Sequence, residues 1–372
     1  PHALSAQMVF ETEAEAAFVI DHNSGQVLLA HNADLPLPPA SMSKLMTLNM
    51  AFEAMQDGRL SLETELPVSQ NAMDYGGSTM FLTTQDRVSV EDLIRGVIVL
   101  SGNDASAVLA EALSPDGTEE GFSALMTERA RQLGMNNSTF RNSNGWPEPG
   151  HVMSMRELGM LSERLVTQFP EYYPYFAETE FAFDGRAPDN RFNRNPILSM
   201  IIGADGLKTG HTQEAGYGLA GSAVQGDRRV TFVISGLDTP QARARESERI
   251  VNWAFRQFAE REVIEPGRVV ATAEVFLGEQ STGDLTIIES LTMLLPAINA
   301  SDVTAEITYE GPLEAPLTAG QEVGEMVIAL EGFAEHRLPV VVAEDVARGG
   351  FMVRISAAAE MAIDQVLGAR GN

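Results

Sequence analysis

A serine and a lysine stand three residues apart in the segment PPASMSKLMT, residues 38–47. Residues i and i+3 of a helix lie on one face, so the side chains of Ser41 and Lys44 can meet. A serine hydroxyl becomes a good nucleophile only when a neighbouring group takes its proton. A lysine in an apolar environment has its pKa lowered by desolvation and can serve as that base. The alternative for this pair is a helix N-cap followed by a lysine that reaches toward solvent.

Two further segments carry side chains that suit the same chemistry. Ser101 and Asn103 stand two residues apart in SGN, where a glycine turn can point both into one cleft. Lys208, Thr209 and Gly210 form KTG at the start of an expected strand. There the lysine can hold a carboxylate, and the glycine permits a ligand backbone to approach closely. Taken alone, SGN could be a simple turn, and KTG could be a simple strand start. In the order SxxK, SxN, KTG, the segments form the signature of class A β-lactamases and penicillin-binding proteins.

The chain resembles the low-molecular-mass penicillin-binding proteins that are serine-type D-alanyl-D-alanine carboxypeptidases. The resemblance extends through SGQVLLAHNADLPLPPASMSKLMT, LIRGVIVLSGNDA, GADGLKTGHTQEAGYGLAGSA and VARGGF, and it covers nearly the whole chain. It implies an enzyme that removes the terminal D-alanine from peptidoglycan stem pentapeptides and that β-lactams acylate and inhibit. It also implies a periplasmic or cell-envelope location in a bacterium, reached with a signal peptide that is absent from this sequence.

The resemblance also implies roles for the residues of the first two motifs. Ser41 would be the acylated nucleophile and Lys44 its base. Ser101 would relay a proton to the leaving group, and Asn103 would orient the substrate amide.

The remaining site residues implied by the resemblance lie later in the chain. The KTG residues 208–210 would form a wall along which the substrate backbone lies as an added strand. His211 would stand beside the site, and its backbone N–H would form an oxyanion hole with that of Ser41; a surface imidazole is the alternative. Arg243 and Arg194 resemble family arginines, and a guanidinium fork can bind the terminal carboxylate of D-alanine. For Arg243, in RARESER, a solvated helix face is the alternative.

The composition narrows the class of protein. A length of 372 residues predicts two or three domains, because one core seldom exceeds roughly 250–300 residues. A formal net charge of −27 argues against nucleic acid and anionic lipid as partners. Without cysteine, disulfides and thiolate metal sites are excluded, and the six histidines lack paired metal-ligand spacing. We therefore expect no metal and no cofactor. No apolar stretch of about 20 residues predicts a membrane-spanning helix.

The expected elements place the motifs in an α/β fold. Helices are predicted from residue 41 to the Asp-Gly pair at 57–58, through much of 85–160 and over 242–261. Within 85–160, Ser89 is an N-cap candidate, with Asp92 three residues on. A hairpin is predicted within 16–34 and two paired strands within 216–237. Together with the resemblance, this pattern predicts a β-lactamase/transpeptidase-like catalytic domain over residues 1–261. Short strands separated by Gly, Pro and acidic turns predict a small all-β domain over 262–350.

The last segment, residues 351–372, returns to a helical composition. The resemblance implies an amphipathic helix on a membrane surface. This tail has one Phe, no Trp, and two basic against two acidic residues. An interfacial helix needs more aromatic and basic residues, so we expect weak peripheral membrane contact at most.

Two other functions fit part of the pattern. A class A-like β-lactamase must hydrolyse its acyl-enzyme rapidly, but the second motif is SGN rather than SDN, and no convincing Glu-x-x-x-Asn follows it. The additional β domain also argues against that class. A non-catalytic peptidoglycan-binding protein on the same scaffold is the second alternative, and the intact motifs argue against it.

Overall fold

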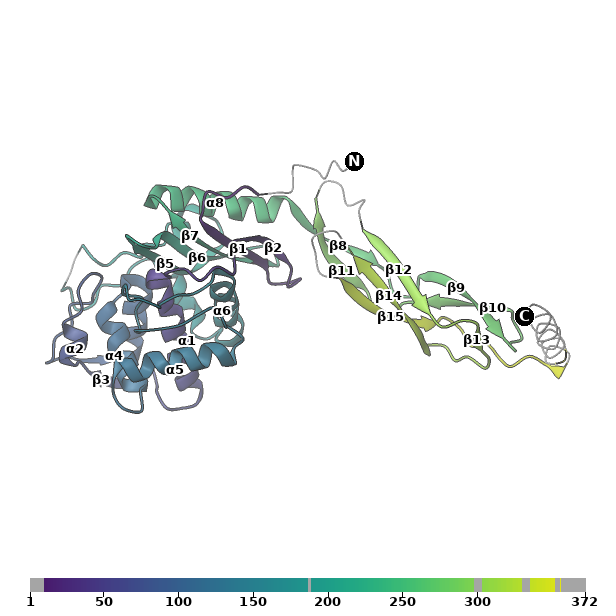
Figure 1. Ribbon diagram of the computed structural model, residues 1–372, viewed down its shortest axis with the longest axis horizontal. Coiled ribbons are helices and arrows are strands. Elements are labelled where there is room, and N and C mark those ends of the chain that lie inside the picture. The colour runs from purple at the N-terminus through teal and green to yellow at the C-terminus, as the bar shows by residue number, and fades with distance from the viewer. Residues whose placement is uncertain (1–9, 187–188, 298–302, 330–334, 352–354, 356–372) are drawn as a thin grey trace, which may run out of the picture. The chain divides into compact units, whose positions relative to one another are not determined.

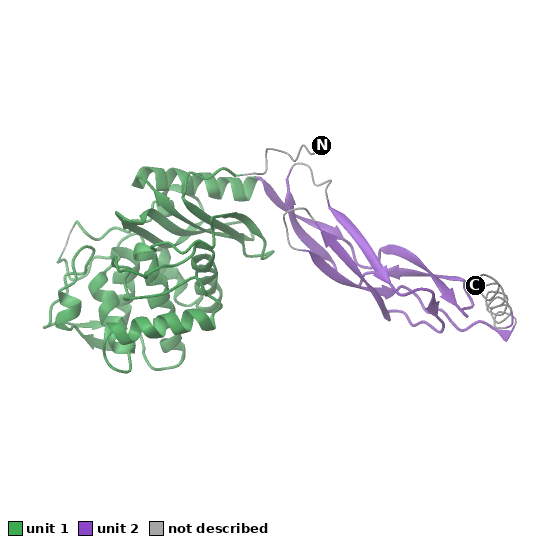
Figure 2. Ribbon diagram, viewed as in Figure 1, with its two compact units in different colours: residues 1–256 green, residues 257–372 purple. Residues whose placement is uncertain are grey.

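The chain folds into two compact units in the computed structural model, which describes residues 10–186, 189–297, 303–329, 335–351 and 355. The division lies between Arg256 and Gln257 (Figure 2). Residues up to 256 are called unit 1 below, and the later residues are called unit 2.

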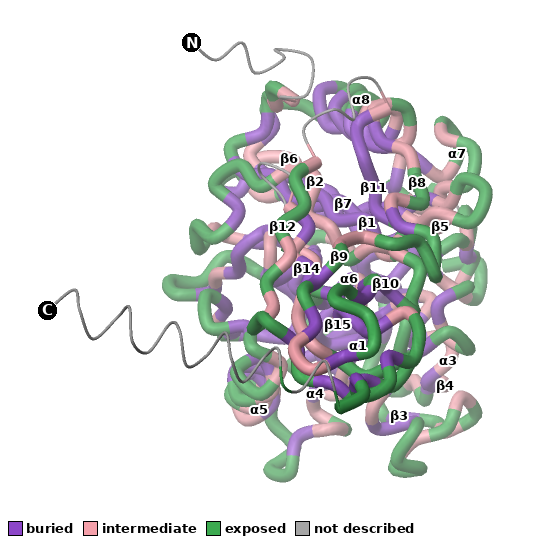
Figure 3. The backbone as a smooth tube through the Cα atoms, turned by 90° about the vertical axis from the view of Figure 1, so that its right-hand side faces the viewer, coloured by how far each residue is buried: buried purple, intermediate pink, exposed green. Residues whose placement is uncertain are grey.

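Unit 1 contains an antiparallel sheet with the strand order β2-β1-β7-β6-β5 (Figure 1). Its strands are β1 (Ala16–Asp21), β2 (Val27–His31), β5 (Ala204–Thr212), β6 (Gly216–Gln225) and β7 (Arg228–Leu237). The predicted hairpin is β1 with β2, and the predicted strand pair is β6 with β7. All six residues of β1 are buried (Figure 3). Successive side chains of a strand point to opposite faces, so Phe18 and Val19 enter separate cores on the two sides of the sheet.

Helices cover both faces of this sheet. α6 packs on β1 and β7, whereas α8 packs on β6 and β7. The α-helices are α1 (Lys44–Gln56), α2 (Gln70–Met73), α3 (Val90–Arg95), α4 (Asn103–Leu113), α5 (Glu119–Gln132), α6 (Met155–Gln168), α7 (Ile197–Met200) and α8 (Pro240–Arg256). Shorter elements are the 3₁₀ turns η1 (Ala40–Ser43) and η3 (Tyr173–Ala177), the π-helical turn η2 (Gly96–Leu100), and the strand pair β3 (Glu65–Pro67) and β4 (Arg87–Ser89).

Side-chain caps fix several helix starts. The Oγ atom of Ser89 accepts a hydrogen bond from the Asp92 N–H at the start of α3, as the sequence predicts. Thr118 caps α5 in the same way through the Gly121 N–H. The helix predicted to end at Asp57-Gly58 is α1, which ends at Gln56.

The helix predicted over 242–261 is wrong at its end. α8 ends at Arg256, and Phe258–Ile264 forms strand β8, paired antiparallel with β11 (Leu291–Pro296). The charged run inside β8 resembles the polar face of a helix, but Phe258 and Ile264 are buried and the middle of the strand is exposed. Pairing with β11 supplies the backbone hydrogen bonds that a longer helix would have made.

The described residues of unit 2 up to Gly350 form strands and loops, which confirms the all-β class predicted for this domain. Its main sheet has the order β12-β14-β15-β10-β9-β13. The strands are β9 (Val269–Phe276), β10 (Thr282–Thr286), β12 (Thr304–Tyr309), β13 (Leu313–Glu314), β14 (Glu322–Ala329) and β15 (His336–Val342). Leu285, Ile328 and Val340 lie in its apolar core. The helical tail predicted over 351–372 lies outside the described residues except for Phe351 and Ile355.

Candidate active site

The serine and lysine of SxxK lie side by side. Ser41 belongs to the 3₁₀ turn η1, and Lys44 is the first residue of α1. The Nζ atom of Lys44 lies 2.8 Å from the Oγ atom of Ser41. Pro39 stands at the N-cap position of η1, where its fixed φ and missing N–H are tolerated. The local sequence therefore starts the helix at the point where the serine and lysine side chains meet.

The Lys44 amine is enclosed by hydrogen-bond acceptors. The side chain is fully buried, with 0 % exposure. Besides the Ser41 hydroxyl, Nζ donates to Oδ1 of Asn103 at 2.8 Å and to the carbonyl oxygen of Asn144 at 2.7 Å. Three acceptors match the three hydrogens of an ammonium group. When Lys44 loses a proton, the Ser41 hydroxyl can become the donor in their shared hydrogen bond.

The electrostatic surroundings favour that neutral form of Lys44. Burial lowers its pKa well below the ordinary value, and the positive charges of Lys208 and Arg194 lower it further. The carboxylates of Asp104 and Glu119 oppose these effects. A lysine in such a site can act as a general base at a pH where an exposed lysine remains protonated.

A second serine–lysine pair comes from SGN and KTG. Ser101 is the C-cap residue of η2, and its φ of 60° is left-handed and rare for a residue with a side chain. Lys208 is 2 % exposed, and its Nζ atom donates to Oγ of Ser101 at 2.9 Å. Burial lowers the pKa of Lys208 to about 7, and Arg194 and Arg243 contribute to the same shift. Ser101 is thus linked to a group that can exchange a proton near neutral pH.

The KTG residues lie in β5, at one edge of the unit 1 sheet. Within the described part of the chain, β5 pairs only with β6, so its other edge can accept an added strand. The structure adds a second constraint on Gly210 to the predicted approach of a ligand. A Cβ atom at this position would lie 2.8 Å from the carbonyl oxygen of Pro39. The missing side chain therefore makes room for the segment before Ser41, rather than only for a ligand.

A cavity of about 390 Å³ joins these groups. Its lining comprises Ser41, Ser78, Ser101, Arg194, Thr209, Gly210, His211, Tyr217, Pro240 and Arg243. The exposed His211 ring stacks on Tyr217, with 3.8 Å between the ring centroids. The structure therefore brings Ser41, Ser101 and the residues after Lys208 to one cavity, with both lysines buried behind it.

The two arginines differ in their surroundings. Arg243, on α8, is 8 % exposed, so it is not on a solvated helix face. Its Nη2 atom donates to the Arg194 carbonyl at 3.3 Å, and its buried Nε atom has no hydrogen-bond partner among the described residues. Arg194 is exposed, and its guanidinium already donates to Ser78 and Asn190. Arg243 thus has donor capacity left for an anion in the cavity.

No role was predicted from the sequence for the loop of residues 76–82, which contacts Asn103 and Asp104. The Nδ2 atom of Asn103 donates to the carbonyl of Gly76, so this side chain already links Lys44 to that loop. The buried carboxylate of Asp104 accepts from the N–H groups of Met80 and Leu82 at 2.9 and 3.1 Å. An acidic residue directly after SGN is the one sequence signal for this anchor.

The small number of lysines in the sequence is a further signal for the site. Lys44 and Lys208 are the two lysines of the sequence, and the other basic residues of the 25 are arginines. Both lysines are buried in this site, which is the reverse of the usual surface position of lysine.

No group of three or more histidine, aspartate or glutamate side chains is placed to hold a metal ion in the described part of the chain. Within the same residues, none of the helices is both long and apolar enough to cross a membrane.

Comparison with known proteins gives matches along most of the chain. Residues 2–239 match the family described as D-alanyl-D-alanine carboxypeptidase, peptidase family S11. Residues 258–348 match the penicillin-binding protein 5 C-terminal domain. The D-alanyl-D-alanine carboxypeptidase DacC of Escherichia coli is 36% identical over 367 residues, which cover 95% of this chain and 90% of that protein.

Solved structures show the same fold. The crystal structure of the D-alanyl-D-alanine carboxypeptidase DacD from Francisella tularensis has a TM-score of 0.78 and 26% identity, and the match covers 94% of this chain and 97% of that one. Penicillin-binding protein D2 from Listeria monocytogenes, solved in an ampicillin-bound form, has a TM-score of 0.59 and 32% identity. That match covers 66% of this chain and 99% of the Listeria chain.

Proposed function

Because the chain belongs to the D-alanyl-D-alanine carboxypeptidase family of serine hydrolases, we propose that it removes the terminal D-alanine from peptidoglycan stem pentapeptides through an acyl-enzyme on Ser41. The observation that carries this proposal is the 2.8 Å contact between Lys44 Nζ and Ser41 Oγ in a site that excludes solvent from the amine. A buried neutral lysine beside a serine supplies the activated nucleophile that acyl transfer needs.

Acylation begins when Oγ of Ser41 attacks the carbonyl carbon of the D-alanyl-D-alanine amide and Lys44 takes the hydroxyl proton. The tetrahedral intermediate carries its negative charge on the former carbonyl oxygen, which the backbone N–H groups of Ser41 and His211 would stabilise. The C–N bond then breaks as the leaving nitrogen receives a proton through Ser101, which Lys208 contacts. Water subsequently adds to the ester, and Ser41 leaves with a proton, releasing the shortened peptide.

Substrate binding would use the edge of the sheet and the arginines. The peptide backbone would lie along β5 at Thr209, and the Asn103 amide would contact the substrate amide. The terminal carboxylate would meet Arg243, whose Nε atom lacks a partner among the described residues. Arg194, which also lines the cavity, adds positive charge in a chain whose net charge is −27. Charge-assisted hydrogen bonds of this kind give both strength and orientation.

The same cavity supports β-lactam binding. The Listeria relative has been solved with ampicillin and with cefotaxime, and we extend this binding to the present chain. A β-lactam amide would acylate Ser41, and slow deacylation would leave the enzyme inhibited. We further place the enzyme in the bacterial cell envelope, with weak peripheral membrane contact at most through residues 351–372.

Mass spectrometry of the full chain tests this function. With penicillin, we expect one covalent adduct, on Ser41; with a stem pentapeptide, we expect release of D-alanine. Ser41→Ala should abolish both, whereas Ser199→Ala, at an exposed serine, should abolish neither. An adduct on another residue, or acylation without D-alanine release, would contradict the proposal. Rapid turnover of penicillin would favour the β-lactamase alternative, and a wild-type chain that never labels would favour the non-catalytic one.

A further inference from the structure

The loop that contains Asn144 and Gly145 is distant in sequence from the three motifs, yet it contacts both Lys44 and the residue before Ser41. Asn144 supplies the carbonyl oxygen that accepts a hydrogen bond from Lys44 Nζ. The next residue, Gly145, has a φ of +81°, and a Cβ atom there would lie 1.9 Å from the carbonyl oxygen of Ala40. Only glycine fits this close approach. The position of the loop therefore sets where the amine of Lys44 points.

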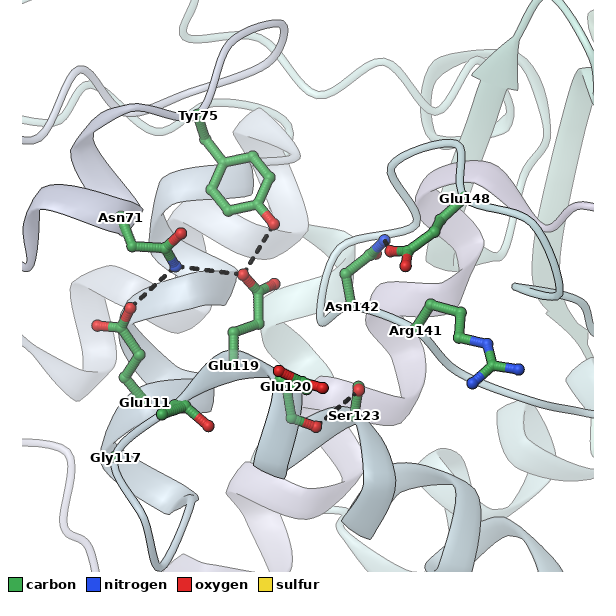
Figure 4. Close-up of a pocket in the computed structure, with 11 residues that line it drawn as sticks. Asn71, Tyr75, Glu111, Gly117, Glu119, Glu120, Ser123, Arg141, Asn142 and Glu148 are labelled. Carbon is green, nitrogen blue, oxygen red and sulfur yellow. Dashed lines mark hydrogen bonds between the residues drawn. The ribbon is translucent and has the colours of Figure 1, made fainter.

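One carboxylate holds this loop in place. Glu119, on the first turn of α5, accepts at Oε1 from the backbone N–H of Ser143 at 2.9 Å and from the Ser143 hydroxyl at 2.5 Å. Its Oε2 accepts from the Tyr75 hydroxyl at 2.7 Å. Figure 4 shows the Tyr75 hydroxyl and the Asn71 amide pointing at this carboxylate. A group surrounded by donors suits an ionised carboxylate, which only accepts.

The other attachment of the loop runs to the helix that carries the base. The Thr47 hydroxyl, on α1, donates to the carbonyl of Ser143. Ser143 is thus held from both sides, by Glu119 on α5 and by Thr47 on α1. The peptide that follows it carries the Asn144 carbonyl.

We propose that Glu119 is a positioning residue for the general base: its carboxylate fixes Ser143, so that the Asn144 carbonyl directs the Lys44 amine toward Ser41. This inference depends on the proposed role of Lys44. Glu119 touches neither Ser41 nor the cavity beside it, and it lines a separate polar cavity of about 740 Å³. It acts through the loop and through its charge.

The charge of Glu119 gives the proposal a distinctive signature. The charged groups that face Lys44 are Lys208 on β5, Arg194 before α7, Asp104 on α4 and Glu119 on α5. Burial lowers the pKa of His151, and the positive charge of Lys44 lowers it further. Glu119 raises the pKa of Lys44, so its neutralisation should lower that pKa. Acylation requires neutral Lys44, and its rate should then rise at a lower pH than in the wild type.

The test is the pH dependence of penicillin acylation of Ser41 in the full chain. Glu119→Ala should reduce the acylation rate constant roughly 10- to 100-fold, the range expected when a reacting group is misplaced. Glu119→Gln keeps the size of the side chain and an acceptor for Ser143, so its rate should fall less while the midpoint of its pH profile moves to lower pH. Glu120→Gln, at the exposed neighbouring position of α5, makes the same change in net charge and should leave rate and midpoint unchanged.

The outcomes separate this inference from the proposed function. A Glu119→Gln variant with both the wild-type acylation rate and the wild-type midpoint would overturn the positioning role, even if Glu119→Ala fails to fold. A wild-type chain that does not acylate on Ser41 would overturn the function itself. Normal acylation of the wild type, together with wild-type behaviour of both Glu119 variants, would remove only the inference.

Discussion

The two units bury different kinds of side chain. Unit 1 buries charged groups beside its apolar core, among them Lys44, Asp104, Lys208 and Arg243. In the described part of unit 2, Thr286 is the buried polar side chain, and the rest of the buried interior is apolar. A buried charge is costly unless other groups replace its water, so a site that retains several is rarely there for stability alone. The comparison places the buried charged groups of the proposed site in unit 1.

The strongest test of this contrast changes the proposed base. Lys44→Arg keeps the positive charge but cannot lose a proton at the pH of an assay. We expect the rate of Ser41 acylation by penicillin to fall by about 100- to 10,000-fold, the usual range for loss of a general base. Lys44→Met, which has a neutral side chain of similar length, should lower the acylation rate by as much. Thermal melting would show that each variant is folded. Acylation near the wild-type rate in a folded variant would make Lys44 structural.

The next effect concerns the carboxylate of the substrate. Arg243→Gln should weaken turnover of a peptide with a free terminal carboxylate about 10- to 150-fold, because a hydrogen bond to a charged group contributes about 1.5–3 kcal/mol. The same peptide as a terminal amide should lose much less. Arg245→Gln is the matched control, since that side chain is 63% exposed on the same helix. Equal losses on both peptides would indicate that Arg243 only packs.

Acid should weaken unit 1 through two histidines whose pKa values are lowered, the buried His151 and the partly buried His22. Burial lowers the pKa of His151 from 6.5 to about 4, and that of His22 also to about 4. Above pH 6.5 the imidazoles are neutral in both the folded and unfolded chain. Between pH 6.5 and 4 the unfolded chain binds more protons at these two histidines, so their contribution to the free energy of unfolding falls as the pH falls and levels off below about 4.

For His151 the loss should reach roughly 2–3 kcal/mol, since its side chain is 4 % exposed. Urea unfolding at several pH values would measure it. His151→Gln should flatten the dependence, whereas His31→Gln, the same change at an exposed strand position, should not. A His151→Gln curve parallel to the wild-type curve would show that this imidazole does not contribute.

The smallest effect is expected in unit 2. The Thr286 hydroxyl donates to the carbonyl of Arg268 at 2.8 Å. Thr286→Val keeps the shape and removes this hydrogen bond, which should cost about 0.5–1.5 kcal/mol of unfolding free energy. Acylation of Ser41 should remain within twofold of the wild type. A larger change in the acylation rate would contradict the expectation that the proposed chemistry depends on unit 1 and not on this hydrogen bond in unit 2.

Motifs and local signals predicted much of unit 1. The order SxxK, SxN, KTG predicted that Ser41, Lys44, Ser101 and Lys208 act together, and the structure brings them to one place. Turn and cap residues predicted the hairpin of β1 and β2 and the start of α3 at Ser89. These signals are local or depend on residue type, so a single sequence shows them.

The groups that hold the site together carry weaker signals. The Asn144 carbonyl is a backbone atom 100 residues from Lys44, and every residue has such an acceptor. Glu119 resembles any acidic residue in the first turn of a helix, where the helix dipole favours it. The close packing of Gly210 on Pro39 and the pairing of β8 with β11 depend on tertiary contacts that periodicity does not reveal.

The most direct measurement of the central claim follows the two lysines themselves. The 372-residue chain labelled with ¹³C at the lysine ε-carbon should give two signals, from Lys44 and Lys208, because this sequence contains no other lysine. The Lys208→Arg variant assigns them. We predict that Lys208 titrates at about pH 7 and that Lys44 titrates well below the usual value of 10.5, with the rate of Ser41 acylation rising as Lys44 loses its proton. A Lys44 signal that titrates near 10.5, while acylation is already maximal at lower pH, would contradict its role as the base.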